Sequence, residues 1–475
     1  MNKEKPVVGF MAVGLEPYWG QFAGMREKCE HHHEIMKGKF APELVQIEDA
    51  GIIDSEELAR KAGENFAEKR VDIVFCQMLT YAASVYIAPV VRNLDVPVIL
   101  LNVQYKKSLD YENVKGIGDW LGEGITCAGI PEATAVLKKL GRKYAIITGH
   151  MEGDQTVEKE MNLWCSAVRI KKIISTKNLG LFGRSYAGMM DLCVDETEIF
   201  KKFGTYIHHL DWQEIIQTGE EVEEERIVRR MEQMKDLFEV NDDISDEDLH
   251  YIAQTAEGCF ELVERYSLSS CATHYEFDAP KEQRDLVAAL NPAMTVLMTE
   301  GIAGAPEGDI KAALAMLILK ETAGNAMTAE LYSMDFNDDT CLIGHSGACD
   351  ANISKEKAVL KMSGVLHGKK GKGYVAQFYP DPGPVTMLAL TDGPDGNYRL
   401  VAAEGMGVKG PILELGDTNL RVKFPKPLRA FVNEWSIEGP THHGVLAKGL
   451  HIKALRCIAA VLDIELKIIT EETVE

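Results

Sequence analysis

The sequence lacks the patterns that mark several common protein classes. It contains ten cysteines, but no CxxC pair, and several cysteines lie within apolar runs such as "IVFCQML". Irregular spacing of this kind indicates reduced, buried thiols rather than a disulfide framework or a zinc ribbon. No apolar run approaches the roughly 18 residues that a membrane span requires.

Positive charge is also scarce. The chain has 51 Lys and Arg residues against 73 Asp and Glu residues, which gives a net charge of −22. An acidic surface repels nucleic-acid phosphates and anionic lipid headgroups, so neither nucleic acid nor a membrane is expected as a partner. The first residues, "MNKEKPVVGFMAV", predict a β-strand rather than a signal peptide, and a cytoplasmic location is therefore expected.

The pattern of apolar runs changes along the 475 residues, a length that suggests about three domains. Four apolar runs in the first third predict buried strands that alternate with helices, as in a parallel sheet covered on both faces. Asp54 is predicted to cap the helix that follows it. The middle third is mostly helical after the strand-like "KNLGLFG". The last third is β-rich, with a hairpin signal in "TDGPDGNY".

A glycine-rich stretch, "GIAGAPEGDIKAALAM" (301–316), is predicted to lead into a helix. Such loops often bind phosphate through backbone N–H groups at the helix N-terminus. Here no GK[ST] follows, and the loop carries Glu307 and Asp309 instead of a lysine, so the P-loop pattern is not met. A carboxylate at this position indicates that the loop binds a ligand other than phosphate.

Four residues of the second half have side chains suited to one metal site. Glu307 lies in the glycine loop, Glu330 near the end of the next predicted helical stretch, His345 on or after a strand, and His443 in a loop before the last helix. Two carboxylates and two imidazoles suit Mn²⁺ or a similar ion. The absence of a cysteine among them argues against structural zinc. The spacing alone does not show whether the four residues meet.

At these segments the chain resembles the L-arabinose isomerase family, within the arabinose/fucose isomerase group. The matching stretches are "PEGDIKAAL", "AELYSMDF", "IGHSG" and "EGPTHHGV", in the family's order and approximate spacing. A further likeness is "YAIITGHMEGDQTVEKEMNLW" (144–164), which resembles the family's Thr-Gly-His segment. The resemblance implies an α/β fold, with two doubly wound α/β domains at 1–171 and 172–321 and a β-rich C-terminal domain at 322–475 that completes the metal site.

The resemblance also implies roles for individual residues. Glu307, Glu330, His345 and His443 would bind the divalent ion, Mn²⁺ or alternatively Co²⁺ or Mg²⁺, and the two glutamates would be the acid/base pair. His443 and Tyr275, in "THYEF", are candidate substrate contacts. Glu123, in "WLGEGIT", stands near the place of a family histidine and is a third candidate. The family's members are commonly hexamers or related homo-oligomers, so a homo-oligomer is expected.

The resulting hypothesis is a metal-dependent aldose–ketose isomerase that acts on a pentose, hexose or related sugar through a cis-enediol. Two alternatives remain open. One is a non-catalytic sugar-binding module, which two α/β domains also build, and the other is a metal-dependent sugar epimerase. The sugar itself is left open by the sequence.

Overall fold

The protein divides into two compact units, which are described here one at a time. The first comprises residues 1–172 and 460–463, and the second 173–459 and 464–475. The computed structural model describes residues 5–124, 126–275, 279–364, 371–411, 413 and 418–469, with the backbone alone at 122–124. The predicted division into three domains stays a prediction.

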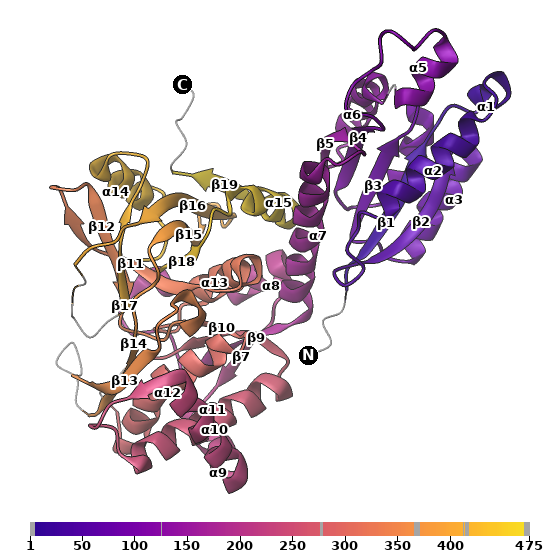
Figure 1. Cartoon of the computed structure of the whole chain (residues 1–475). Helices are drawn as coiled ribbons and strands as arrows, with labels where there is room; N and C mark the ends of the chain where they lie inside the picture. The colour runs from indigo at the N-terminus through magenta and orange to yellow at the C-terminus, as the bar shows by residue number, and fades with distance from the viewer. Residues whose placement is uncertain are drawn as a thin grey trace. The chain divides into compact units, whose positions relative to one another are not determined.

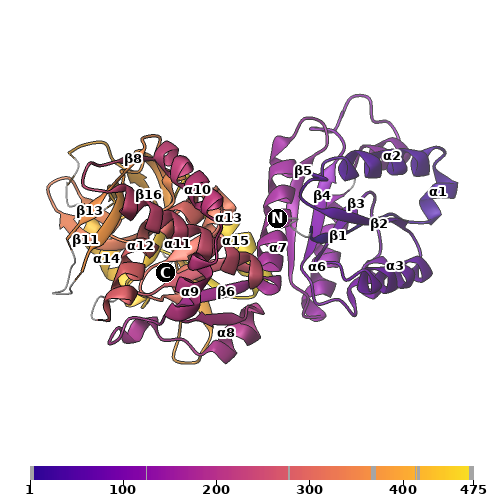
Figure 2. The same cartoon turned by 90° about the horizontal axis from the view of Figure 1, so that it is seen from below.

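The first unit is a five-stranded parallel sheet in the order β2-β1-β3-β4-β5. Helix α2 lies on one face, and α3 and α6 lie on the other (Figure 2). The strands are β1 (Val7–Val13), β2 (Gln46–Ile53), β3 (Ile73–Met78), β4 (Val98–Gln104) and β5 (Tyr144–His150). The helices are α1 (Pro17–Gln21), α2 (Met25–Lys37), α3 (Glu56–Glu68), α4 (Ala88–Val91), α5 (Ile117–Gly124), α6 (Ile130–Lys139) and α7 (Gln155–Thr176), which continues into the second unit.

The alternation of strands and helices predicted for the first third is confirmed, but the predicted helix cap is wrong by one residue. Ser55 caps α3, and its side chain accepts a hydrogen bond from the Leu58 N–H. Asp54 instead accepts a hydrogen bond from the indole N–H of Trp19 at 2.8 Å. Both residues suit a helix N-terminus, and the tertiary contact to Trp19 decides between them.

The second unit opens with a four-stranded parallel sheet and a set of helices (Figure 1). The strand order is β10-β9-β6-β7. The strands are β6 (Asn178–Phe182), β7 (Ile207–Leu210), β9 (Leu268–Thr273) and β10 (Ala303–Ala305). The helices are α8 (Glu196–Phe203), α9 (Trp212–Glu220), α10 (Glu224–Leu237), α11 (Asp246–Arg265), α12 (Lys281–Thr299) and α13 (Ile310–Ala323), together with the short 3₁₀ helix η3 (Met190–Leu192).

The rest of the second unit is strand-rich, so the predicted fold class is confirmed. Six antiparallel strands form a closed ring in the order β15-β18-β11-β12-β17-β16, because β16 also pairs with β15, and β19 pairs with β16 in parallel. These strands are β11 (Met327–Asp335), β12 (Thr340–His345), β15 (Gly383–Asp392), β16 (Tyr398–Gly407), β17 (Thr418–Lys423), β18 (Gly444–Lys448) and β19 (Glu465–Ile468). A small sheet contains β8 (Phe238–Val240), β13 (Ala358–Ser363) and β14 (Gly373–Gln377), and the last helices are α14 (Leu428–Ile437) and α15 (Ile452–Leu462).

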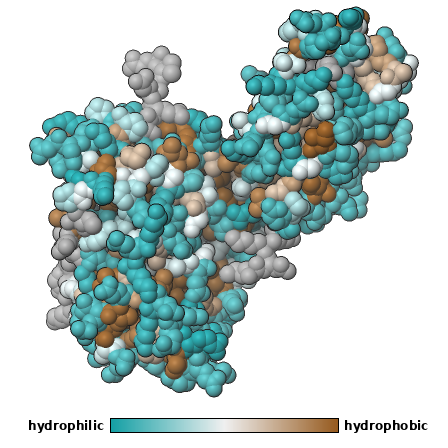
Figure 3. All heavy atoms as spheres, in the orientation of Figure 1, coloured by the Kyte–Doolittle hydropathy of each residue, from teal (hydrophilic) through white to brown (hydrophobic). Residues whose placement is uncertain are grey.

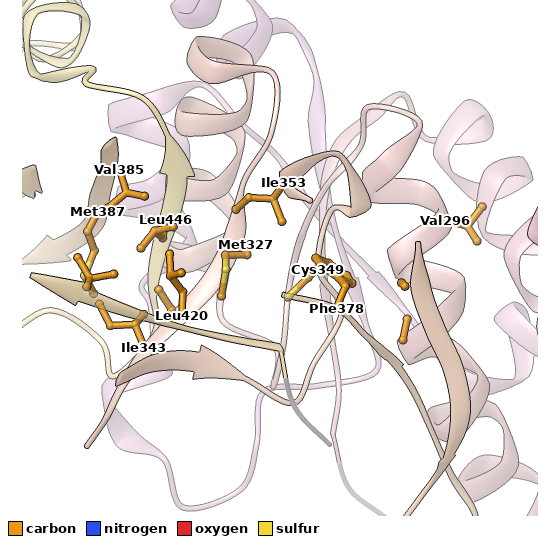
Figure 4. Close-up of a cluster of buried hydrophobic side chains, with 14 of the residues drawn as sticks. Val296, Met327, Ile343, Cys349, Ile353, Phe378, Val385, Met387, Leu420 and Leu446 are labelled. Atoms are coloured by element: carbon orange, nitrogen blue, oxygen red, sulfur yellow. The ribbon is translucent and has the colours of Figure 1, made fainter. Parts of the chain in front are cut away.

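In the second unit, one hydrophobic core joins α10, α11 and α12 to the strand-rich part, and a second core lies at the parallel sheet. Figure 4 shows Ile343, Met387, Leu420 and Leu446 gathered between the barrel strands, and all four are buried. Helix α13 is buried along its length from residue 310 to 320, as expected for a helix that is apolar on all sides. It contacts β9 and β10 of the parallel sheet and β15 and β18 of the barrel. The N-terminus of α13 is therefore held firmly on both sides.

The polarity of the surface and the state of the cysteines agree with what the composition predicts. On the face shown in Figure 3, hydrophilic residues predominate and hydrophobic ones are scattered. All ten cysteines are free thiols, and eight of them are buried. Among the described residues, no helix is both long enough and apolar enough to span a membrane.

Candidate active site

The glycine loop between β10 and α13 places Glu307 in a constrained backbone conformation. Glu307 has a positive φ of 58°, which is uncommon for a residue with a side chain, and such residues cluster at functional sites. Gly308 follows with φ 72°, and a Cβ there would lie 2.5 Å from the Cα of Ser185. The loop is also held by hydrogen bonds from the Tyr186 N–H to the Glu307 carbonyl and from the Gly308 N–H to the Thr273 carbonyl, each 2.9 Å.

Three neighbouring barrel strands bring Glu330, His345 and His443 to the same place. Glu330 on β11 pairs with Gly344 on β12, directly before His345. Ala329, the neighbour of Glu330, pairs with Gly444 on β18, directly after His443. The predicted helical position of Glu330 is therefore wrong, because α13 ends at Gly324 in a left-handed conformation and the chain then enters β11.

The four predicted side chains and His442 form two groups that share His443. One group is Glu307, His442 and His443, and the other is Glu330, His345 and His443. Within each group the ligand atoms lie within 4.8 Å of one another. His443 Nε2 is 3.7 Å from Glu307 Oε2 and 3.9 Å from Glu330 Oε1. His442 Nε2 is 3.4 and 3.6 Å from the same two oxygens.

Each of the two adjacent histidines is oriented by an aspartate. His443 donates from Nδ1 to Asp309 Oδ2 at 3.0 Å, and both side chains are fully buried. The other oxygen of Asp309 accepts the Ala312 N–H at 2.9 Å and so caps α13. His442 donates from Nδ1 to Asp191 Oδ2 at 2.7 Å. In both histidines the Nδ1–H bond leaves Nε2 directed at the glutamates.

Negative charge dominates the site, because four carboxylates surround three imidazoles. Contact with the Glu307 carboxylate raises the pKa of His442 to about 9, and Asp191 and Glu330 contribute to the increase. Burial lowers the pKa of His345 well below its usual range, and repulsion from His443 and His442 adds to this effect. His345 is therefore neutral, as metal ligation requires. The excess of carboxylates favours a divalent cation.

Two buried atoms support a metal at this point. Glu307 Oε2 and His443 Nε2 are each buried and make no hydrogen bond among the residues that the structure describes. Buried polar atoms without a hydrogen bond are rare, and a bound ion would satisfy both of these atoms. The mixed oxygen and nitrogen donors suit Mn²⁺ or a similar ion. At His345 an ion would compete with the Gly347 N–H, which donates to Nδ1 at 2.7 Å.

A cavity of about 390 Å³ opens onto this group of side chains. Its wall includes Glu307, Glu330, His345 and His442, so a small molecule in the cavity can contact both carboxylates. Tyr275 also lies on the wall, and its ring stacks on that of Tyr186 at 6.3 Å between centroids. Glu123 lies in α5, but its side chain is outside the described residues.

Three residues of the site were not among the sequence-predicted candidates. His442 adjoins His443, and the "THH" pair was the signal that could have indicated it. Asp309 stands in the glycine loop, but its contact with His443 spans 134 positions of sequence. Asp191 carries no local signal, because it follows an ordinary exposed turn.

Comparison with known proteins finds similarity to sugar isomerases. A family model described as the L-arabinose isomerase C-terminal domain matches residues 325–465. This match covers the C-terminal part of the chain, which is therefore similar to the L-arabinose isomerase family. The L-arabinose isomerase of a Nocardioides species is 22% identical over 391 residues, which cover 79% of this chain and 76% of that protein. The sulfoquinovose isomerase of Priestia megaterium is 21% identical over 422 residues, which cover 88% of this chain and 90% of that protein. The L-arabinose isomerase of Escherichia coli K12 is 22% identical over 411 residues, which cover 80% and 77% of the two chains.

The matched domain contains much of the site. Residues 325–465 include Glu330, His345, His442 and His443, whereas Glu307 and Asp309 lie before its start. The site thus combines one loop of the preceding parallel sheet with the barrel of the family's C-terminal domain.

Proposed function

We propose that the protein is a metal-dependent aldose–ketose isomerase of carbohydrate metabolism that converts its sugar through a cis-enediol. The observation that carries the proposal is the meeting of two glutamates and three histidines beside one cavity, whose wall includes both glutamates, together with two buried atoms that make no hydrogen bond among the described residues. The relatives are named as isomerases of L-arabinose and of sulfoquinovose, which are both aldoses, and this supports the same reaction class.

The residues that would hold a divalent ion are Glu307, Glu330, His345 and His443. Mn²⁺ is the favoured ion, with Co²⁺ or Mg²⁺ as alternatives. When bound, the ion would make a sugar hydroxyl more acidic and would stabilise the negative charge of an enediolate. Asp309 holds the proton of His443 on Nδ1, so that Nε2 keeps its lone pair.

The two glutamates are proposed to transfer the protons of the reaction. One carboxylate removes the proton from C2 of the aldose and returns it to C1, while the other moves the proton between O1 and O2. Glu307 is the preferred base at carbon, because its constrained backbone fixes the position of its side chain. Tyr275 and His443 are proposed sugar contacts, and Glu123 stays a prediction.

The test is conversion of an aldose panel after chelation, with and without added Mn²⁺. The panel contains L-arabinose, D-galactose, L-fucose and sulfoquinovose. Ketose formation that requires Mn²⁺ is the expected result. Sugar binding without conversion would instead favour a sugar-binding module, and an epimeric aldose as product would favour an epimerase.

Substitution of the glutamates tests the proton transfers. Glu307→Gln and Glu330→Gln should each lower turnover by at least about 10²-fold, because each removes one acid/base group. Turnover within tenfold of wild type in both variants would refute the assignment.

We further expect a cytoplasmic homo-oligomer, with a hexamer favoured, and size-exclusion chromatography with light scattering would measure its size.

A further inference from the structure

His442 and His443 are adjacent in sequence, but their surroundings differ. Their rings lie 4.0 Å apart between centroids. The side chain of His443 is fully buried, whereas that of His442 is 34% exposed. His442 forms part of the cavity wall, and His443 is not among the described residues that line it. A molecule in the cavity would therefore meet His442 first.

Asp191 fixes His442 by two hydrogen bonds to one oxygen. Its Oδ2 accepts the backbone N–H of His442 at 3.1 Å and the ring Nδ1–H at 2.7 Å. One carboxylate oxygen thus sets both the backbone position and the ring orientation. Asp191 belongs to η3, and the preceding Met189 lies on the cavity wall, so this contact joins two separate segments of the wall.

The fixed ring points Nε2 at the two proposed acid/base glutamates. His442 Nε2 lies 3.4 Å from Glu307 Oε2 and 3.6 Å from Glu330 Oε1. A nitrogen between the two proposed acid/base carboxylates is placed to hydrogen-bond a sugar oxygen that exchanges its proton with one of them. A shift of about 1 Å in such a group lowers the rate by about 10²-fold.

We propose that His442 contacts the substrate oxygen at the reacting end of the sugar, and that Asp191 is the positioning residue that holds it there. The proposal rests on the proposed function for the identity of the substrate as an aldose. It assigns His442 a role distinct from that of His443, which faces the proposed metal site from the buried side.

The test compares His442→Ala, Asp191→Ala and the double variant. Asp195→Asn is the matched control, because Asp195 caps the nearby α8 through the Thr197 and Glu198 N–H groups and asparagine caps equally well. The measurements are kcat and KM for an aldose converted by the wild type, and calorimetric affinities for Mn²⁺, for that aldose and for its alditol.

Each single alanine variant should lower kcat/KM by about 10- to 100-fold and weaken alditol binding, while Mn²⁺ affinity stays within threefold of wild type. The double variant should be no worse than His442→Ala, because Asp191 acts through His442. The proposal is overturned if His442→Ala loses tenfold or more in Mn²⁺ affinity, if Asp191→Ala behaves like the control, or if the two effects add.

The proposed function and this inference fail in different ways. If the wild type makes no ketose, the proposed function fails. The inference is then tested by calorimetric binding of L-arabinose and sulfoquinovose to the same variants. Weaker binding in both alanine variants would support the inference, and unchanged or undetectable binding would overturn it. If the wild type makes ketose and the variants match it, the inference alone fails.

Discussion

The two oxygens of Asp309 have separate partners, so one substitution can remove the hydrogen bond to His443 and keep the helix cap. Oδ1 caps α13 through the Ala312 N–H, and Oδ2 accepts Nδ1–H of His443. Asp309→Asn keeps the shape and can keep the cap, because Asn and Asp cap helices about equally well. It also replaces the second oxygen by an NH₂ group, which can only donate. His443 must then accept at Nδ1 and carry its proton on Nε2, the atom proposed to bind the ion.

The magnitudes follow from these two bonds. A hydrogen bond to a charged group contributes about 1.5–3 kcal/mol, so Asp309→Asn should lower the free energy of unfolding by about that amount or less. Asp309→Ala also removes the cap, which contributes about 1 kcal/mol, and should cost about 2.5–4 kcal/mol in all. Loss of the partner that orients a histidine ligand typically weakens metal binding by about 10- to 100-fold.

Mn²⁺ titration of the chelated protein, together with urea unfolding, measures both quantities. Asp211→Asn is the matched control. Asp211 caps α9 through the Glu214 N–H at the same 2.9 Å, and its side chain is in neither group of candidate ligands. The control should change neither stability nor Mn²⁺ affinity by much. If Asp309→Asn binds Mn²⁺ within twofold of wild type, the assignment of His443 Nε2 as a ligand is wrong.

Two further substitutions test the fold around and away from the site. Gly308→Ala should cost about 2–5 kcal/mol in urea unfolding, because φ is positive and the new Cβ meets backbone, whereas Gly141→Ala, with φ 65° and nothing within 4 Å, should cost only about 1–2 kcal/mol. Equal costs would contradict the close approach. Burial by itself raises the pKa of Asp248. Hydrogen bonds, among them those from Tyr374 and Lys372, lower the pKa by a larger amount, so the folded-state pKa lies below the unfolded value. The stabilisation is then present above about pH 4 and lost as the pH falls through the folded-state pKa. The deficit of Asp248→Asn relative to wild type should shrink between pH 6 and pH 2, and a deficit independent of pH would refute this assignment.

Four of the five strands of the first unit's sheet could be predicted because they are apolar runs, whereas β2 was missed because it is partly polar and mostly incompletely buried. Fully buried strands such as β3 show their position without any long-range information. The cap of α3 was displaced by one residue, and Glu330 was placed on a helix. In both cases a tertiary contact outweighed the local pattern. Asp54 bonds to the indole of Trp19 instead of capping α3, and Glu330 lies in a strand that pairs with β12 and β18.

The candidate site was only partly accessible from the sequence. Donor chemistry and the family resemblance selected Glu307, Glu330, His345 and His443, and the structure brings these four together. Their meeting depends on strand register and on the packing of α13 between two sheets, which no local pattern encodes. Asp191 could not have been selected, because its contact with His442 spans 251 positions and its own segment is only a short 3₁₀ helix.

The most direct measurement is an anomalous-scattering map of the protein crystallised with Mn²⁺. The central claim is that the cavity wall holds a divalent ion among Glu307, Glu330, His345 and His443, and it requires one strong peak within bonding distance of these side chains. A map without a peak there, or with Mn²⁺ bound only elsewhere on the acidic surface, would contradict the claim.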